Sequence, residues 1–596
     1  MNNFLTKKEN LFLIGIFIAA FSIRLAFMLA AKQNYFFYHN PGSDVTYYAE
    51  WAKEIATESF IGKKAFSGLP LYPYALSVLY RLSLGHMELI RLFHLLLGSL
   101  NCVLLFLLSK KIFSLNTAVL ASIFTGFNFM MIYYDWLMMP VTLIIFLSLV
   151  IIIALIDRDQ LKSAQWSMLG VLIGLTTLGD GKFLFFAIAT FIWLWIAEPF
   201  RRKQAVIMIL SAFCVLGLTC LRNKIIGGDW ILISSQSGLS LYAGNHPDAN
   251  GTYTNPQFIR PSHQGQDEDQ KIVAEAILNR TMTEGEVSAF WKSKALQFIR
   301  HHPDQFLRLV LKKFRLFFTE TEYAHDMDLL FMREWKYRLE WNALFILFPL
   351  ALIGMLVTFK KWKNQPFVIF LIVCQMAVTL IFFLATRHRA TILPFLIAFE
   401  SVAIFWLIDR FKNRDGLQIA AAISFIVLFA AVFQPVFMDN KVLTYNRYAK
   451  AGAVYDKRGD LKNAEKSYLK ALELTPGDSN LLYNLGNVYM KDGRLEQAEQ
   501  TYKQALSICG YNVDALFNLA FLYEQTGRES EALQIYDKIS QYQPDSPDIF
   551  FRIANIYDKA GDCEKAFTFY QKVVDLSPIL KKEIQKYIAH CSEKPL

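Results

Sequence analysis

The sequence predicts an all-α protein in two parts: a polytopic membrane domain of about eleven transmembrane helices, and after it an α-solenoid of helical repeats. Two observations lead to this prediction. Of the 596 residues, 54% are hydrophobic and 15% aromatic, which is too apolar for an ordinary soluble protein. Apolar runs long enough for helical spans are spread over residues 1–440, whereas residues 441–596 repeat with a period of 34 residues.

Eleven apolar runs are the candidate membrane spans. The first follows Lys7 and Lys8 and is too long for the core of a signal peptide, so we expect it to be retained. The fifth and sixth runs are short, and they could instead form a re-entrant pair. The runs cover residues 11–31, 89–108, 117–133, 137–156, 166–178, 183–196, 205–221, 342–359, 366–385, 392–408 and 417–433.

Basic residues between the spans give the expected orientation. If the spans simply alternate, the short Lys and Arg runs all fall on one side, and the positive-inside rule makes that side the cytoplasm. This distribution also argues against nucleic acid as the reason for the net charge of +10. Two long loops, about residues 32–88 and 222–341, then face outward together with the repeats. We expect an integral protein, of the bacterial inner membrane, with a cytoplasmic N-terminus and periplasmic repeats.

In the C-terminal part, three residue types recur at intervals of 34 residues, and each set of equivalent positions is called a column here. Each unit is predicted to be a helical hairpin, in which Gly lets the chain leave the first helix and Ala lets the two helices approach closely. The columns are Gly459, Gly493, Gly527 and Gly561; Ala464, Ala498, Ala532 and Ala566; and Tyr468, Tyr502, Tyr536 and Tyr570. The pattern resembles tetratricopeptide repeats, about four with a capping helix, which implies that the array binds a protein partner. An array that only packs or dimerises is the alternative.

Asp44 is the first candidate for chemistry. Pro41-Gly42-Ser43-Asp44 precedes a helical pattern in the first outer loop, so Asp44 is expected at the start of an amphipathic helix near the outer membrane surface. The simpler interpretation is a helix N-cap, because Asp is favoured there.

Several motifs, in their order along the chain, resemble the GT-C superfamily of membrane glycosyltransferases, in particular the branch of protein O-mannosyltransferases and lipid A aminoarabinose transferases. They are Gly42-Ser43-Asp44, Leu69-Pro70-Leu71-Tyr72-Pro73, Arg222-Asn223, Leu241-Tyr242-Ala243-Gly244-Asn245-His246-Pro247, Gly251-Thr252-Tyr253 and His302-Pro303-Asp304. The resemblance implies a GT-C fold for residues 1–440. One difference is that Ser67 and Gly68 stand where the aminoarabinose transferases have an acidic residue and a lysine; Lys63 and Lys64 lie nearby.

Asp135 matches a second acidic residue of this family. It lies at the outer end between the third and fourth spans, in Tyr133-Tyr134-Asp135-Trp136. The resemblance implies a catalytic role for it alongside Asp44. An interfacial, solvated carboxylate flanked by belt aromatics is the alternative.

Arg387, His388 and Arg389 form a basic cluster after the ninth span, on the outer side where such clusters are disfavoured. An anion is therefore expected nearby, and guanidinium groups bind phosphate oxygens in a bidentate way. The resemblance implies that this cluster holds the phosphate of the donor. Lys182 and Arg222 also face outward and could join this pocket. The alternative for all of them is an anchor to lipid headgroups.

The implied reaction is an inverting displacement in which Asp44 accepts the proton of an acceptor hydroxyl and Arg387 with Arg389 stabilises the departing lipid phosphate. No G-x-G-x-x-G turn or P-loop is present, so a polyprenyl-phosphate sugar rather than a nucleotide sugar is the expected donor, and a protein hydroxyl the expected acceptor. No metal site is assigned, although a divalent cation is left open, because a single Asp44 is a poor ligand set. Two alternatives are an oligosaccharide transferase of the O-antigen ligase or polymerase type and a non-catalytic scaffold that recruits proteins through the repeats.

Overall fold

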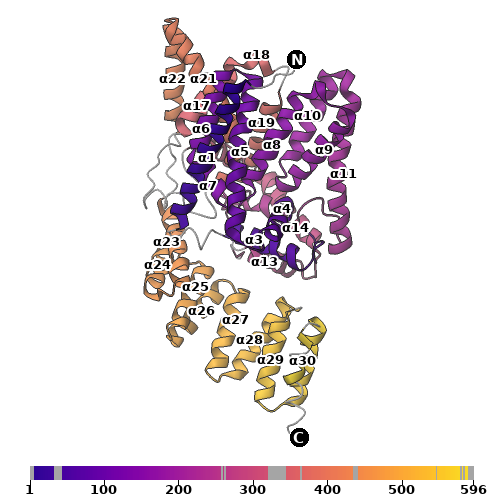
Figure 1. Cartoon of the computed structure of the whole chain (residues 1–596). Helices are drawn as coiled ribbons and strands as arrows, with labels where there is room; N and C mark the ends of the chain where they lie inside the picture. Colours follow the sequence, from indigo (N-terminus) through magenta and orange to yellow (C-terminus); the bar gives the residue numbers. More distant parts are fainter. Residues whose placement is uncertain are drawn as a thin grey trace. The chain divides into compact units, whose positions relative to one another are not determined.

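The computed structural model of this chain is all-α, as predicted. It describes residues 6–32, 43–254, 256, 259–260, 263–319, 344–362, 366–433, 440–544, 546–577, 580–581 and 584–587, and among these the β-structure is limited to an isolated bridge between Thr252 and Leu384. Two compact units are present, Met1–Phe437 and Met438–Leu596 (Figure 1).

Each predicted apolar run of the first unit coincides with a helix, the third with a bent pair. By length and composition, Lys7–Lys32, Met87–Ile112 and Pro199–Gly227 qualify as membrane spans, and the pair α6–α7, bent by 55°, would make a fourth. Five other apolar helices of the described residues are shorter than a span, so the number eleven stays a prediction. The helices are α1 (Lys7–Lys32), α5 (Met87–Ile112), α6 (Leu115–Phe127), α7 (Phe129–Trp136), α8 (Val141–Ile156), α9 (Ser163–Gly179), α10 (Phe183–Ala197), α11 (Arg202–Gly227), α17 (Leu344–Val357), α19 (Phe367–Ile381), α21 (Leu393–Lys412) and α22 (Gly416–Val432).

Small residues bring α9 and α11 into close contact. A Cβ atom added at Gly170 would lie 2.1 Å from the carbonyl oxygen of Met208, and one at Gly174 would lie 2.8 Å from that of Ala212. Glycines spaced four residues apart on one helix face allow such backbone approach between apolar helices.

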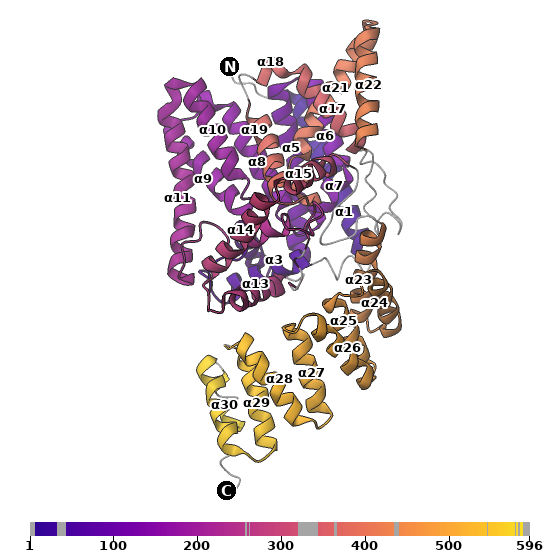
Figure 2. The same ribbon diagram turned by 180° about the vertical axis from the view of Figure 1, so that it is seen from behind.

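The ends of the helices separate into two groups. Figures 1 and 2 show α3 (Ser43–Thr57), α13 (His263–Leu278) and α14 (Glu284–His301) at one end of the unit and α18 (Phe359–Trp362), with Lys360, at the other. Ion pairs link several of the basic residues that were expected on one side. The pairs are Glu9–Lys110 at 2.6 Å, Lys111–Asp157 at 2.8 Å and Arg158–Glu198 at 2.5 Å. The start of α1 and the ends of α5, α8 and α10 therefore meet.

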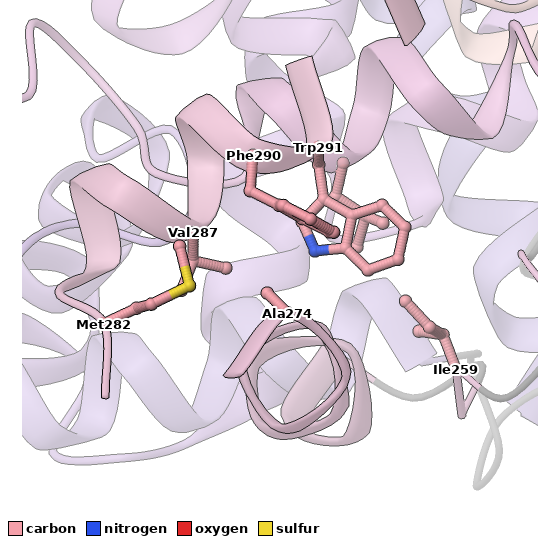
Figure 3. Close-up of a cluster of buried hydrophobic side chains, with 7 residues drawn as sticks. Ile259, Ala274, Met282, Val287, Phe290 and Trp291 are labelled. Atoms are coloured by element: carbon pink, nitrogen blue, oxygen red, sulfur yellow. The ribbon is translucent and has the colours of Figure 1, made fainter. Parts of the chain in front are cut away.

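The second outer loop folds around its own apolar core. Trp291 lies at the centre of this cluster and donates a hydrogen bond from Nε1 to the carbonyl oxygen of Gln270 at 3.0 Å. Figure 3 shows the cluster, which consists of Leu239, Ile259, Ala274, Met282, Val287, Phe290 and Trp291. The loop contributes α12 (Ser237–Ala243), α13, α14 and α15 (Pro303–Phe317), whereas the first loop contributes α3 and α4 (Leu71–Leu82). This core packs α12, α13 and α14 against one another.

The second unit is a helical repeat array, as predicted. Gly459, Gly493, Gly527 and Gly561 have φ angles of 76°, 77°, 73° and 81°. Such left-handed conformations favour glycine. The Ala and Tyr columns are buried. Its helices are α23 (Asn440–Lys457), α24 (Leu461–Leu474), α25 (Ser479–Lys491), α26 (Leu495–Ile508), α27 (Val513–Gln525), α28 (Glu529–Tyr542), α29 (Pro547–Lys559) and α30 (Cys563–Leu576). Of the expected capping helix, only residues 580–581 and 584–587 are described.

Candidate functional site

Asp44 lies in the first turn of α3, and its buried carboxylate connects three segments that are distant in sequence. His263, at the start of α13, donates from Nε2 to Oδ1 of Asp44 at 2.5 Å. Arg387, in α20 (Thr386–Ala390), donates from Nη1 to Oδ2. A negative charge in the first turn of a helix is also favoured by the helix dipole. The carboxylate of Asp44 is therefore held by a cation and a histidine.

The second outer loop places Arg387 opposite Asp44. The isolated bridge joins Thr252 to Leu384, whose N–H donates to the carbonyl oxygen of Gly251 at 3.1 Å. Gly244 lies so close to the end of α19 that a Cβ there would be 1.8 Å from the carbonyl oxygen of Phe382. These contacts fix the backbone just before α20, so the position of Arg387 depends on the loop.

Tyr253 lies in the same cluster. Its ring packs edge-on against Phe383 with the centroids 5.0 Å apart. Burial raises the pKa of Tyr253, and the negative charge of Asp44 raises it further, against the opposing effect of Arg387. The phenol is therefore protonated at neutral pH, beside the carboxylate and the guanidinium.

A ring stack holds His263 in place. The ring of Tyr47, on α3, stacks on that of His263 with the centroids 4.1 Å apart, and its hydroxyl shares a hydrogen bond of 3.0 Å with Ser67. A Cβ at Gly68 would lie 2.8 Å from Oη of Tyr47. The small residues at 67 and 68 thus make room for Tyr47, in the place where the aminoarabinose transferase pattern has an acidic residue and a lysine.

Lys63 and Lys64 do not take over that place. Lys63 pairs with Glu58 at 2.8 Å, and both side chains are exposed. Lys64 is also exposed and lies 3.6 Å from Asp267, which accepts a hydrogen bond from Gln236 at 2.8 Å. Neither lysine has a described contact with Asp44.

Lys182 and Arg387 both lie close enough to His388 for their charges to act on it. Lys182 pairs with Asp180 at 3.2 Å, and Asp180 also accepts a hydrogen bond from Gln375, on α19, at 2.8 Å. Burial lowers the pKa of His388 well below its usual range, and the positive charges of Lys182 and Arg387 lower it further. His388 is therefore neutral at neutral pH, and the cations of this region are Lys182 and Arg387, each of which is paired with a carboxylate.

Arg389 is directed to backbone carbonyl groups at the end of α15. Its buried guanidinium donates from Nη1 to the carbonyl oxygen of Thr319 at 2.7 Å and to that of Phe317 at 3.4 Å. This arrangement ties α20 to the second outer loop. The described contacts of Arg389 thus suit positioning of the cluster rather than membership of it.

Arg222 holds the first outer loop. It donates to the carbonyl oxygens of Ile61 at 2.9 Å and Lys64 at 2.8 Å, and its guanidinium lies 3.7 Å from the centroid of the Phe66 ring. Its neighbour Asn223 is buried and accepts a hydrogen bond from the Phe66 N–H at 3.2 Å. The Arg222-Asn223 motif therefore fixes the segment that leads to Ser67.

Asp135 is buried in a separate cluster. Arg24, in α1, donates from Nε to its carboxylate at 2.7 Å, and Thr142 donates at 2.8 Å. A Cβ at Gly98, on α5, would lie 2.1 Å from Oδ2 of Asp135. The pair thus joins α1, α5, α7 and α8. The described contacts do not connect it to the Asp44 cluster.

An open cavity of about 810 Å³ lies between α3 and the start of α5, and its lining includes Val45, the residue after Asp44. Its lining is mainly apolar and includes Glu50, Glu88 and Arg91 as charged groups. The residues are Val45, Thr46, Ala49, Glu50, His86, Met87, Glu88, Leu89, Arg91, Leu92 and Met138. A substrate could therefore approach the start of α3 from this side. Among the described residues there is no group of three or more His, Cys, Asp or Glu side chains arranged to hold a metal ion.

The structure brings Asp44, Arg387 and Lys182, which the sequence analysis named, together with His263 and Tyr47, which it did not name; their roles stay a prediction. His263 lies 219 residues after Asp44, and no spacing rule connects the two. The one local signal is that Tyr47 shares the start of α3 with Asp44.

Known families match both parts of the chain. Residues 65–224 match the family of dolichyl-phosphate-mannose-protein mannosyltransferases, and residues 452–493, 478–545 and 547–579 match tetratricopeptide repeats. These matches confirm both expected resemblances. No curated protein sequence matches the chain.

Three solved structures match parts of this chain at low sequence identity. MamA is 21% identical over 25% of this chain and 91% of its own, with a TM-score of 0.23. YrrB, described as a TPR protein with an unusual peptide-binding site, is 22% identical over 30% of this chain and 88% of its own, with a TM-score of 0.23. The Archaeoglobus fulgidus oligosaccharyltransferase, in complex with Zn and sulfate, is 13% identical over 74% of this chain and 55% of its own, with a TM-score of 0.40.

Proposed function

We propose that this chain, a membrane glycosyltransferase with a C-terminal tetratricopeptide-repeat array, transfers a sugar from a polyprenyl-phosphate donor to an extracytoplasmic acceptor, a protein hydroxyl. The observation that carries the proposal is the pairing of a buried carboxylate, Asp44, with Arg387 beside Lys182. A base and two cations in one cluster are what displacement of a sugar from a phosphate requires.

The reaction is a single displacement with inversion. The acceptor oxygen attacks the anomeric carbon on the face opposite the phosphate, while Asp44 takes the hydroxyl proton. The bond between the anomeric carbon and the phosphate oxygen breaks, and its electron pair leaves with the lipid phosphate. Arg387 and Lys182 stabilise the negative charge on this leaving group.

Arg387 has two roles in this scheme, because its guanidinium pairs with Asp44 in the structure. The donor phosphate, a diester with one negative charge, competes with the carboxylate for Arg387, and it becomes the stronger partner as the bond to the sugar breaks and a second charge develops on the leaving phosphate. Asp44 then keeps His263 and becomes a better base, because a neighbouring cation no longer stabilises its ionised form. The donor thus activates the base.

Arg389, Arg222 and Asp135, which the sequence also suggested as site residues, do not contact the reacting groups in this scheme. Arg389 and Arg222 hold the two outer loops in place through backbone carbonyl groups. The buried pair of Asp135 with Arg24 stabilises the helix packing, and removing either partner would leave an uncompensated charge. We therefore assign catalysis to Asp44 and binding of the leaving group to Arg387 and Lys182.

The repeats favour a protein acceptor. Arrays of this kind offer an extended concave surface to protein partners. By the positive-inside rule, the repeats and the Asp44 loop face the same side of the membrane. The acceptor segment would thus be presented where the base lies.

A reconstitution experiment tests the proposal. Purified protein in vesicles is given radiolabelled polyprenyl-phosphate hexoses and pentoses, and donor turnover is compared between the wild type and Asp44→Asn. Asp267→Asn is the matched control, because Asp267 is also acidic and lies on the same helix as His263. We expect turnover in the wild type and the control and none in Asp44→Asn, with all three equally folded.

Each other outcome decides against a part of the proposal. Equal turnover in the wild type and Asp44→Asn would remove Asp44 from the mechanism. Absence of turnover in the wild type with every donor would favour the scaffold. Undiminished transfer to proteins by a chain truncated after Lys441 would show that the repeats do not select the acceptor.

A further inference from the structure

Helix α15 of the second outer loop presents two different stripes to its surroundings. Leu307, Leu311 and Phe314 lie three and four residues apart, on one side of the helix, and are 59%, 59% and 38% exposed. A parallel stripe of exposed cations lies next to them on the helical wheel. It consists of Arg308, Lys312 and Arg315. A soluble surface helix would not be expected to expose this apolar stripe at full length.

The apolar stripe continues onto the end of a helix that is expected to cross the membrane. Phe314 packs against Phe433, directly after α22, with the ring centroids 6.2 Å apart. Phe318, one turn further along, packs against Phe433 at 5.2 Å and against Phe429 at 5.7 Å. The stripe therefore lies beside the end of α22, and for a helix that crosses the membrane such an end marks the boundary between hydrocarbon and headgroups.

The opposite face of α15 is buried and holds the segment that carries Arg387. Lys313 donates from Nζ to the carbonyl oxygen of Phe382 at 2.6 Å and to Oδ1 of Asn245 at 3.1 Å. At the C-terminal end of the helix, Arg389 donates to the carbonyl oxygen of Thr319 at 2.7 Å. The helix thus has one face that contacts the backbone before Arg387 and the side chain of Arg389 after it, and another face that is exposed.

We propose that α15 is an interfacial helix that binds the outer leaflet of the membrane. Leu307, Leu311 and Phe314 enter the boundary between acyl chains and headgroups, and the basic stripe binds the phosphates of anionic lipids. Helices with an apolar side and a cationic side bind in this plane, with a strength that depends on the anionic lipid content. This inference stands on the exposure and contacts of α15 and does not depend on the proposed function.

Lipid is the occupant that the structure favours over a protein partner. A protein surface would need its own complementary acidic and apolar stripes, whereas a bilayer supplies phosphates and acyl chains side by side at one depth. The contact between Phe314 and Phe433 fixes α15 at that depth. A second copy of this chain, or residues 320–343 of the same chain, are the other outcomes that the experiment distinguishes.

The test is site-specific photo-crosslinking in the full chain. The photoreactive residue p-benzoylphenylalanine replaces Leu307 or Leu311, and the purified protein is reconstituted in phosphatidylcholine vesicles, with and without phosphatidylglycerol, that contain a trace of fluorescent phospholipid. Gln305, exposed on the other side of α15, and Leu296, an exposed leucine of α14, are the control positions. We expect several-fold more lipid adduct at 307 and 311 than at 305 and 296, and more with phosphatidylglycerol.

A charge variant tests the basic stripe. Replacement of Arg308, Lys312 and Arg315 by Gln should leave the adduct at 311 in neutral vesicles and abolish the increase with phosphatidylglycerol. Mass spectrometry of the adducts identifies what covers the stripe. A protein adduct at 311, or equal lipid adduct at 311, 305 and 296, would overturn the proposal. A change in the size-exclusion elution profile would identify an unfolded triple variant. In that case the crosslinking results of the single substitutions at 307 and 311 decide whether the stripe contacts lipid.

Discussion

Arg387 and Asp44 form an ion pair although 343 residues separate them in the sequence. The pair depends on both outer loops, because Arg222 holds the first loop and the bridge between Thr252 and Leu384 holds the second. In our scheme Asp44 acts as the base and Arg387 binds the phosphate of the donor. Substitutions of the two residues should therefore differ in their effects on proton transfer and on donor binding.

Replacing Arg387 by Gln should lower donor turnover by about 10²–10³-fold, because it removes a charged donor that stabilises the leaving phosphate. Arg387→Lys should recover part of the loss, since an ammonium keeps the charge but not the forked geometry. Steady-state kinetics with varied donor concentration is the measurement. Equal activity of Arg387→Gln and the wild type would exclude Arg387 from the site.

His263→Phe should keep the stack on Tyr47 but lose the hydrogen bond to Asp44. His263 orients the carboxylate of Asp44, and a displaced base transfers the proton less efficiently, so we expect kcat to fall by about 10–100-fold. Because His263 contacts the base and not the leaving group in our scheme, KM for the donor should change little. A variant that raises only KM would place His263 in the donor pocket instead.

Gly68→Ala should destabilise the protein through Tyr47. The added Cβ would lie 2.8 Å from Oη of Tyr47 and 3.4 Å from the Trp51 ring. Overpacking of this kind costs about 1–3 kcal/mol. In a Tyr47→Phe background the hydroxyl is absent, so the same substitution should cost less. Thermal unfolding of the four proteins, with Gly15→Ala as the control at an uncrowded glycine, measures this coupling. Equal costs in both backgrounds would contradict it.

These residues show how far local sequence patterns extend. The start of α3 and the hairpins of the repeats are set by residues within one or two turns, so spacing alone predicts them. Asp44 was found because it marks a helix start after a turn. The same reasoning could not find His263, whose contact with Asp44 arises only after both outer loops have folded.

The position of a charged residue in the sequence did not predict which group its side chain contacts. Arg387 and Arg389 are two residues apart, and the sequence assigned both to the phosphate. In the helical turn of α20 their guanidinium groups point to different segments, one to Asp44 and the other to the end of α15. For Asp135, its partner Arg24 lies in the middle of the first apolar run, and only the packing of α1 on α5 and α7 reveals the pair.

Gly493→Ala should destabilise the repeat unit, because Gly493 has a φ of 77° and no atom within 4 Å of an added Cβ. The cost then comes from the left-handed backbone alone, about 1–2 kcal/mol. Gly477 has equal space without such a φ, so Gly477→Ala is the matched control and should be neutral or slightly stabilising. Urea denaturation of residues 438–596 measures both. Equal effects would show that backbone conformation does not determine the glycine column.

Lys313 should make stability depend on pH. Burial lowers the pKa of its amine from 10.5 to about 7. Between pH 7 and pH 10.5 the amine carries a proton in the unfolded chain but not in the folded chain. The free energy of unfolding therefore rises with pH in this range, by up to about 1.4 kcal/mol per pH unit. As the pH falls toward 7, the pKa in the folded protein, the free energy of unfolding decreases. Below that pH the amine is protonated in both states, so Lys313 adds no further dependence on pH. Thermal unfolding across the window should show a smaller slope for Lys313→Met than for the wild type, whereas Lys312→Met, at the exposed neighbouring residue, should keep it. An unchanged slope in Lys313→Met would show that Lys313 is charged in the folded protein.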